Sequence, residues 1–177
     1  MGCALSVDLH ALSLWHQTTP DDWTPRPSLP GDRDADVAIV GAGFTGLWTA
    51  LYLARADPTL RIAVIEAETA GFGASGRNGG WCSALFPASL ESLARRSSRD
   101  GALAQHAAMR HSVDEVARAA SDEGIDAHIA KGGTVTLARS GPQWARARSE
   151  VAHARSWGRG DDELRLLDAG EAAAVLA

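Results

Sequence analysis

Three glycines and one glutamate in the first half of the chain are spaced as contact with a phosphate and a sugar would require. The glycines form the pattern G-x-G-x-x-G between Gly41 and Gly46. In this pattern the first glycine permits a tight turn, the second lets the backbone approach a pyrophosphate, and the third lets a helix pack closely on a strand. The N–H groups and positive dipole end of that helix attract phosphates. We therefore expect Gly41, Gly43 and Gly46 to cradle a diphosphate.

Glu66 lies about 20 residues after the third glycine, at the end of an apolar run. A carboxylate at that position accepts hydrogen bonds from the ribose hydroxyls of an adenosine. Its negative charge repels a 2′-phosphate, which argues against NADP. The sequence therefore predicts a dinucleotide site with Glu66 at the ribose. The alternative is a packing turn without a ligand, with Glu66 exposed to solvent.

The residues around this turn have the patterns of two strands and one helix. Short apolar runs at 36–40 and 61–66 are typical of strands buried on both faces. Apolar residues at helical spacing predict a helix between them that ends near Asp57-Pro58; they are Leu47, Ala50, Leu51 and Ala54. A strand, a helix and a strand of this combined length form a crossover with parallel strands. We therefore expect an α/β fold built on a Rossmann-like βαβ unit.

A second glycine-rich segment, Gly71–Gly80, begins shortly after Glu66. Its many small residues let the backbone wrap closely around a bulky group. A nicotinamide-binding domain usually returns quickly to a third strand, whereas FAD also needs its ribityl chain and flavin ring held. The segment therefore favours FAD over NAD, and a merely flexible surface loop is the alternative.

Three stretches of the chain carry a family resemblance: VAIVGAGFTGL at 37–47, IE at 65–66 and GASGRNGG at 73–80. They are similar to the D-amino-acid oxidase-like (DAO) family of FAD-dependent oxidoreductases. The similarity is greatest to its glycine oxidase, sarcosine oxidase and gamma-glutamylputrescine oxidoreductase-like branch. The leader Ser13-Leu14-Trp15 before a proline-rich arm also resembles the last of these groups. The match is strong over 36–88 and weak from 89 onward.

The resemblance implies FAD contacts for both glycine-rich segments and for Glu66, which would hold the adenosine ribose. The pyrophosphate would contact Gly41, Gly43, Phe44, Thr45 and Gly46. The pyrophosphate and flavin side would be lined by Ser75, Arg77, Asn78, Gly79 and Gly80. Two alternatives stay open, namely Arg77 as a solvated surface residue and Asn78 as a brace that bonds its own loop. We expect Cys82 to be a buried small apolar residue rather than a point of flavin attachment.

The resemblance also implies a reaction. An oxidised flavin would take the equivalent of a hydride from the carbon next to the nitrogen of a small-molecule amine or amino acid. The resulting imine would hydrolyse, and oxygen or an electron-transfer partner would reoxidise the flavin. The sequence assigns no catalytic residue, substrate or oligomeric state. Two alternatives stay open: a truncated non-catalytic remnant or nucleotide-binding module, and the half of an NAD-dependent dehydrogenase.

Patterns along the chain divide it into three segments. We expect an extended arm over 1–35, because the prolines from Pro20 to Pro30 forbid a helix there. The FAD-binding unit and its second loop would cover 36–88. Residues 89–177 would hold the start of an α+β substrate domain, with helices over 89–123 and 142–157, a half-buried strand at 134–137 and a last helix from Asp168. Since a stable small sheet needs three or more strands, we interpret the chain as the truncated N-terminal part of a longer protein.

The composition excludes several other classes of protein. A net charge of -5 and a pI near 5.6 argue against nucleic acid as the main partner. No apolar run is long enough for a membrane span. With only two cysteines we expect no disulfide framework and no metal site, and a cytoplasmic location. Met1–Ser6 fits the short myristoylation template, which we interpret as a chance match.

Overall fold

The computed structural model describes Asp8, Ala11 and residues 13–176. The chain folds as two compact units, Met1–Trp81 and Cys82–Ala177. The myristoylation template at Met1–Ser6 lies outside the described residues. The glycine-rich segments and Glu66 all belong to the first unit.

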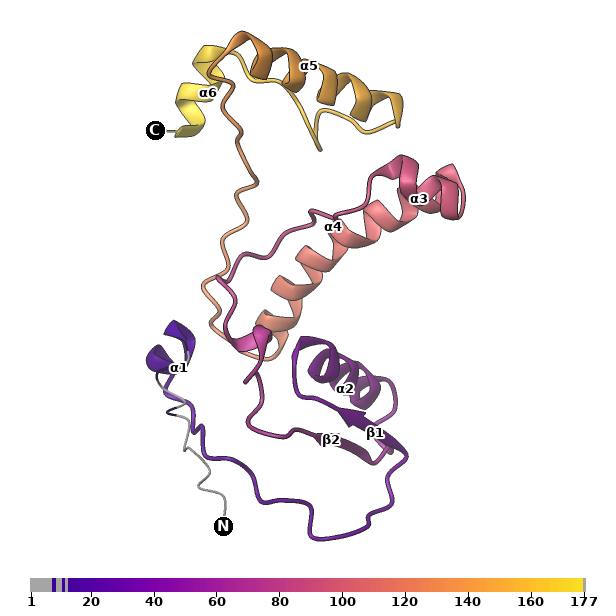
Figure 1. Cartoon of the computed structure of the whole chain (residues 1–177), viewed down its shortest axis with the longest axis vertical. Helices are drawn as coiled ribbons and strands as arrows, with labels where there is room; N and C mark the ends of the chain where they lie inside the picture. The colour runs from indigo at the N-terminus through magenta and orange to yellow at the C-terminus, as the bar shows by residue number, and fades with distance from the viewer. Residues whose placement is uncertain (1–7, 9–10, 12, 177) are drawn as a thin grey trace. The chain divides into compact units, whose positions relative to one another are not determined.

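The first unit contains the predicted strand–helix–strand crossover (Figure 1). Strand β1 (Val37–Val40) leads into helix α2 (Phe44–Ala56), and β2 (Ile62–Ile65) follows. The two strands are parallel, with Cα partners running from Val37 and Ile62 to Val40 and Ile65. Helix α2 packs on both strands. A parallel pair with a crossover helix is the Rossmann-like unit that the sequence predicts.

The prediction that both strands are buried on both faces is wrong. Side chains of β1 alternate between partly buried and exposed, and Val40 is 87% exposed. In β2, Val64 and Ile65 are also exposed. A parallel strand is buried on both faces only when each face of its sheet is covered. Helix α2 packs on this pair, and the exposure of Val40, Val64 and Ile65 shows that these apolar strands are not covered on both faces.

An ion pair joins the first ends of the two strands. Arg61 donates through Nε and Nη2 to the carboxylate of Asp36, over 3.1 and 2.9 Å. The backbone N–H of Arg61 also donates to Asp36 Oδ2 over 2.8 Å. These hydrogen bonds from Arg61 lower the pKa of Asp36 to about 2. The pair fixes the strands at the end opposite the glycine turn.

The N-terminal arm is not extended throughout. Leu14–Thr18 form the short helix α1, whose N-cap Ser13 accepts a hydrogen bond from the backbone N–H of His16. From Pro20 to Ala35 the chain has neither helix nor strand, in keeping with prolines that lack an N–H donor. The helical turn therefore ends just before the first proline of the arm.

The second unit is helical over most of its length. Its helices are α3 (Leu90–Arg96), α4 (Arg99–Asp122), α5 (Gly141–Ser156) and α6 (Ala169–Leu176). Serine side chains cap the first three of these helices, as expected for N-cap positions. Asp168 and Glu171 form the predicted reciprocal cap of α6, with bonds of 2.8 and 2.9 Å. Within the described residues, no helix is both long and apolar enough to cross a bilayer.

Trp157, just after α5, anchors the core of the second unit. It is buried with Leu90 and Ala102, and Leu93, Ala94 and Leu103 pack around them. The indole Nε1 donates to Glu91 Oε1 over 2.7 Å. The guanidinium of Arg99 lies over the indole ring, 4.5 Å from its centroid. The end of α5 is thereby held to α3 and the start of α4.

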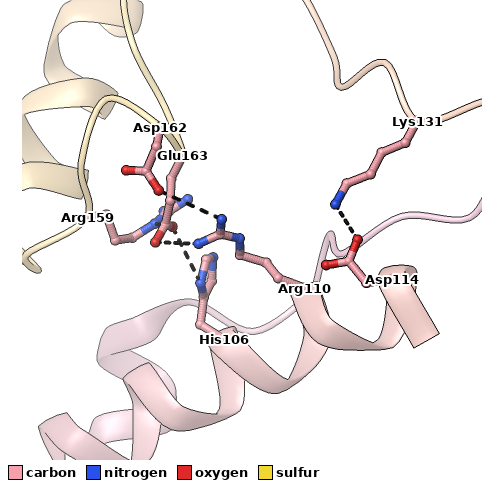
Figure 2. Close-up of polar contacts among 7 residues, drawn as sticks. All are labelled: His106, Arg110, Asp114, Lys131, Arg159, Asp162 and Glu163. Atoms are coloured by element: carbon pink, nitrogen blue, oxygen red, sulfur yellow. Dashed lines mark hydrogen bonds and ion pairs between the residues drawn. The ribbon is translucent and has the colours of Figure 1, made fainter. Parts of the chain in front are cut away.

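Charged side chains hold the turn after α5 against the middle of α4 (Figure 2). Glu163 accepts from Arg110 at 2.6 Å and from Arg159 at 2.8 Å, and it lies 3.8 Å from His106 Nδ1. Asp162 lies 4.0 Å from Arg110, and Lys131 pairs with Asp114 farther along α4. Burial, followed by the charge of Arg159, lowers the pKa of His106. The imidazole is therefore neutral at pH 7 and fills space between charged groups.

The strand predicted at 134–137 is absent. Residues 125–139 have no regular structure and are exposed, and Val135 and Leu137 keep 39% and 53% of their surface accessible. A strand forms only when its backbone groups pair with a neighbour. No such neighbour lies alongside it in the part of the chain that the structure describes. The alternation of apolar and polar residues at 134–137 therefore shows only that this segment could pair with a strand, not that it does.

Candidate cofactor-binding site

The first glycine turn brings the start of α2 into close contact with the end of β1. Gly41 has a φ of 100° and donates its N–H to the carbonyl of Ile65 over 2.7 Å. A Cβ on Gly46 would lie 2.0 Å from the carbonyl oxygen of Gly41 and 3.2 Å from Ile39. Such distances leave no room for a side chain. Gly41 and Gly46 therefore have the turn and packing roles expected of the first and third glycines.

The first turn of α2 can receive an anion. Its N-cap Gly43 has no side chain to cap the helix, and the first helical turn carries no acidic residue. Phe44 and Thr45 are exposed, and the Phe44 side chain keeps 57% of its surface accessible. The helix therefore presents backbone N–H groups and the positive end of its dipole at this turn. No carboxylate of this helical turn would repel a phosphate.

The carboxylate of Glu66 turns towards the same loop. Its Oε2 accepts the N–H of Ala42 over 2.7 Å. Its Oε1 accepts the N–H groups of Ala67 at 2.9 Å and Glu68 at 3.2 Å. These backbone hydrogen bonds, that from Ala42 first, lower the pKa of Glu66. The side chain is therefore ionised at neutral pH, and Oε2 keeps a lone pair that can accept from a hydroxyl.

Ala42 links the first glycine turn to Glu66 and to the second glycine loop, a role that the sequence did not indicate. Its N–H donates to Glu66, while its carbonyl accepts the N–H of Gly71 over 2.9 Å. The residue keeps only 4% of its surface accessible. Because both links use backbone atoms, the alanine side chain gives no sequence signal. Its place between two glycines of the motif is the single clue.

The second glycine loop meets the first at the start of α2. Ser75 lies in the 3₁₀ turn η2 (Ala74–Gly76), and its Oγ accepts the N–H of Phe44 over 2.9 Å. A Cβ on Gly43 would lie 3.0 Å from that oxygen. The hydroxyl proton of Ser75 remains able to donate to a phosphate oxygen. The structure thus brings the predicted residues Gly43, Phe44 and Ser75 together around one point.

Farther along the second loop, the side chains of Arg77 and Asn78 bond backbone groups of the same loop. Asn78 Nδ2 donates to the carbonyl of Ser75 over 2.5 Å, and its Oδ1 accepts the N–H of Gly80 over 2.7 Å. Asn78 therefore braces the loop, as one of the two alternatives stated. Arg77 is exposed, donates from Nε to the carbonyl of Gly73 over 3.2 Å, and lies over the ring of Phe72. A side chain on Gly79 would meet no atom within 4 Å. Contacts of Arg77, Asn78, Gly79 and Gly80 with a cofactor stay predictions.

Cys82 is exposed, so the expectation that it is a buried apolar residue is wrong. It begins the second compact unit and follows directly after Trp81, which is itself 73% exposed. The apolar residues that follow it along the chain, Leu85 and Phe86, are exposed as well. Apolar residues next to Cys82 in the sequence therefore do not bury it in the fold.

A family model described as DAO, FAD dependent oxidoreductase, matches residues 36–177. The chain belongs to this family. The cofactor of the DAO family is FAD, and the residues present fit it. The fit rests on a helix whose N-cap residue, Gly43, has no side chain, on the 3.0 Å that would separate a Cβ at Gly43 from Ser75, and on an ionised Glu66 beside the turn.

Two curated relatives place this DAO chain among oxidoreductases. Gamma-glutamylputrescine oxidoreductase of Escherichia coli (strain K12) is 30% identical over 158 residues, which is 89% of this chain and 36% of the relative. Probable oxidoreductase OrdL of Rhizobium meliloti (strain 1021) is 47% identical over 66 residues, which is 37% of this chain and 15% of the relative. The chain therefore spans about a third or less of the length of these relatives.

A shorter similarity extends beyond oxidoreductases. Thiamine thiazole synthase of Emericella nidulans is 48% identical over 52 residues, 29% of this chain and 16% of the relative. No solved structure matches the chain significantly. The long match to the Escherichia coli protein, which covers 89% of the chain, is therefore the more informative comparison for function.

Proposed function

We propose that this chain is the FAD-binding part of an oxidoreductase that oxidises a C–N bond of a small-molecule amine or amino acid. Membership of the DAO family supports the cofactor and the reaction class. The amine is suggested by the relative named gamma-glutamylputrescine oxidoreductase, which aligns with 89% of this chain. The geometry of both glycine loops supports the position of the cofactor within the first unit.

In this proposal the pyrophosphate of FAD lies at the start of α2. The N–H groups of Thr45 and Gly46 in the first helical turn and the hydroxyl proton of Ser75 donate to its oxygens, while the N–H of Phe44 stays bonded to Ser75 Oγ. Glu66 accepts hydrogen bonds from the adenosine ribose, with its carboxylate already aligned by the N–H of Ala42 at 2.7 Å. Thr45, Arg77, Asn78, Gly79 and Gly80 lie on the same two loops and complete the set that we propose for the cofactor.

The contribution of these residues is binding and orientation. When bound, FAD supplies an electron sink that accepts the equivalent of a hydride from the carbon next to an amine nitrogen. The side chains and amides of the two loops hold the diphosphate and so fix where the flavin ring can lie. Precise positioning of this kind contributes to rate because reacting atoms must approach within a narrow range of distances. We assign no catalytic residue to this part of the chain.

The contact between Phe44 N–H, Ser75 Oγ and Gly43 carries the proposal, because it brings both loops to the start of one helix. Gly43→Val tests it. Gly43 has φ −84° and ψ −175°, an extended backbone that valine tolerates. Its side chain would displace the Ser75 hydroxyl and occupy the space for phosphate. We expect FAD binding, measured by flavin fluorescence quenching, to fall by at least about a hundredfold, equivalent to roughly 2.7 kcal/mol.

Gly132→Val is the matched control, because a side chain there would meet no atom within 4 Å. It introduces the same residue into open space in the second compact unit and should leave FAD affinity unchanged. Circular dichroism of both variants checks that each is folded. Equal FAD affinity in Gly43→Val and the unaltered chain would refute the phosphate position. Tight binding of NAD without FAD would refute the cofactor assignment in this chain.

A further inference from the structure

The N-terminal arm reaches the second glycine loop through two side-chain hydrogen bonds. Ser13 Oγ donates to the carbonyl of Gly76 over 2.7 Å. Trp15 Nε1 donates to the carbonyl of Asn78 over 2.6 Å. Each bond joins residues 63 positions apart. The arm therefore fixes two backbone carbonyls of the loop, one on either side of Arg77.

Aromatic rings of the arm also pack on the glycines of this loop. His16 is fully buried, and a Cβ on Gly76 would lie 3.1 Å from its Cε1. A Cβ on Gly80 would lie 3.1 Å from Cζ2 of Trp15. The ring of Trp23 lies against His16, with ring centroids 4.2 Å apart. The absence of side chains at Gly76 and Gly80 thus lets the arm approach the loop backbone closely.

The hydroxyl of Ser13 uses its full hydrogen-bonding capacity. It donates its one proton to the carbonyl of Gly76. It accepts the backbone N–H of His16 at 3.3 Å and lies 2.7 Å from His16 Nδ1. A hydroxyl has one donor and two acceptor positions, so a proton on Nδ1 would let the imidazole donate to the remaining acceptor position. Ser13 therefore joins the buried histidine and the loop in one network.

We propose that Ser13, Trp15 and His16 are positioning residues that hold loop 74–80 in the shape that receives FAD. This inference rests on the proposed function, since it names what sets the affinity of that same site. The link runs through the loop backbone, because Asn78 bonds the carbonyl of Ser75 and Ser75 bonds the start of α2. A loop held in its binding shape before the ligand arrives loses less conformational entropy on binding.

The inference is tested by removing the two arm donors while keeping the packing. Ser13→Ala removes a hydroxyl, and Trp15→Phe keeps an aromatic ring without the N–H. Because a hydrogen bond contributes about five- to tenfold to an equilibrium, we expect the double variant to bind FAD on the order of thirtyfold more weakly. Ser13→Thr retains the hydroxyl, and we expect Ser13→Thr with native Trp15 to bind FAD within about twofold of the unaltered chain.

Two control variants make the same changes at a serine and a tryptophan that donate neither of these hydrogen bonds to the loop. Ser28→Ala changes an exposed serine of the same arm. Trp144→Phe changes a tryptophan on α5 whose exposure, 43%, is close to the 39% of Trp15. Both control variants should bind FAD with the affinity of the unaltered chain. FAD binding by the double variant that equals that of the controls would overturn the inference, while Gly43→Val separately tests the proposed function.

A second readout needs no cofactor. In the FAD-free chain, amide hydrogen exchange of the segment 74–80 should rise about tenfold or more in the double variant. Exchange of β1 and α2 should not change, which separates a local effect on the loop from a general loss of stability. An unchanged loop, or an equal rise in all segments, would overturn the inference. If the unaltered chain takes up no FAD, the proposed function fails, and this exchange measurement alone decides whether the arm holds the loop.

Discussion

The N–H of Ala42 donates to the carboxylate of Glu66 over 2.7 Å, across 24 positions of sequence. This bond spans the two parallel strands at the end where the chain leaves β1 for α2. It places a negative charge beside the turn while the helix start, a short distance along the chain, presents its positive end. The two features that the motif requires, an acceptor for a sugar and donors for a diphosphate, are thereby brought together at one end of the βαβ unit.

Glu66→Gln should weaken FAD binding without unfolding the chain. Glutamine keeps the shape of the side chain, but its NH₂ cannot accept a ribose hydroxyl and its oxygen carries no charge. Hydrogen bonds to charged groups contribute about 1.5–3 kcal/mol, so we expect affinity to fall by roughly ten- to a hundredfold. Isothermal titration with FAD measures this effect. Glu68→Gln, at the neighbouring exposed position, is the control, and equal effects of the two substitutions would contradict the role of Glu66.

Gly46→Ala should destabilise the first unit. The added Cβ would lie 2.0 Å from the backbone oxygen of Gly41, which cannot move without shifting the glycine turn. Overpacking of this kind costs about 1–3 kcal/mol. Urea unfolding followed by circular dichroism measures the change. Gly132→Ala places the same methyl group in open space and should leave the midpoint within experimental error; a similarly small effect at Gly46 would show that the turn is not tightly packed.

Asp36→Asn should lower stability in a way that depends on pH. Hydrogen bonds from Arg61 lower the pKa of Asp36 from 3.8 to about 2. A carboxyl whose pKa is lowered by folding stabilises the folded state above its unfolded pKa, and this contribution disappears as the pH falls towards the folded value. The difference in urea midpoint between the unaltered chain and Asp36→Asn should therefore be full at pH 5 and shrink between pH 4 and 2. Asp21→Asn, on the exposed arm, should show no such trend.

Local patterns were sufficient to predict the elements of the crossover. The apolar runs became β1 and β2, the helical spacing from Leu47 became α2, and its end falls at Ala56, next to the Asp57-Pro58 stop signal. The contacts that complete the site were not predictable in the same way. Trp15 reaches Asn78 through a backbone carbonyl, and Ala42 reaches Glu66 through an N–H. Backbone groups are the same at every residue, so such contacts give no sequence signal.

Burial was harder to predict than secondary structure because it depends on neighbouring layers. The apolar residues of β1 indicated a strand covered on two faces, yet Val40 is largely exposed. Val135 and Leu137 alternate as in a strand, yet they have no strand to pair with among the described residues. In both cases the local sequence shows which side chains are apolar, but their burial depends on whether another element packs against them.

His106→Gln should change how the second unit responds to mild acid. Burial and then the charge of Arg159 lower the pKa of His106, while Glu163 opposes them and Arg110 adds to them. A histidine whose folded pKa lies below its unfolded value of about 6.5 is protonated first in the unfolded state. The unaltered chain should therefore lose stability as the pH falls through that value, and His106→Gln should lose less.

Thermal unfolding at pH 7.5, 6.5 and 5.5 measures the trend, with His111→Gln, which changes an exposed histidine of the same helix, as the control. Parallel pH curves for His106→Gln and the unaltered chain would show that the cluster of Figure 2 does not hold this imidazole neutral.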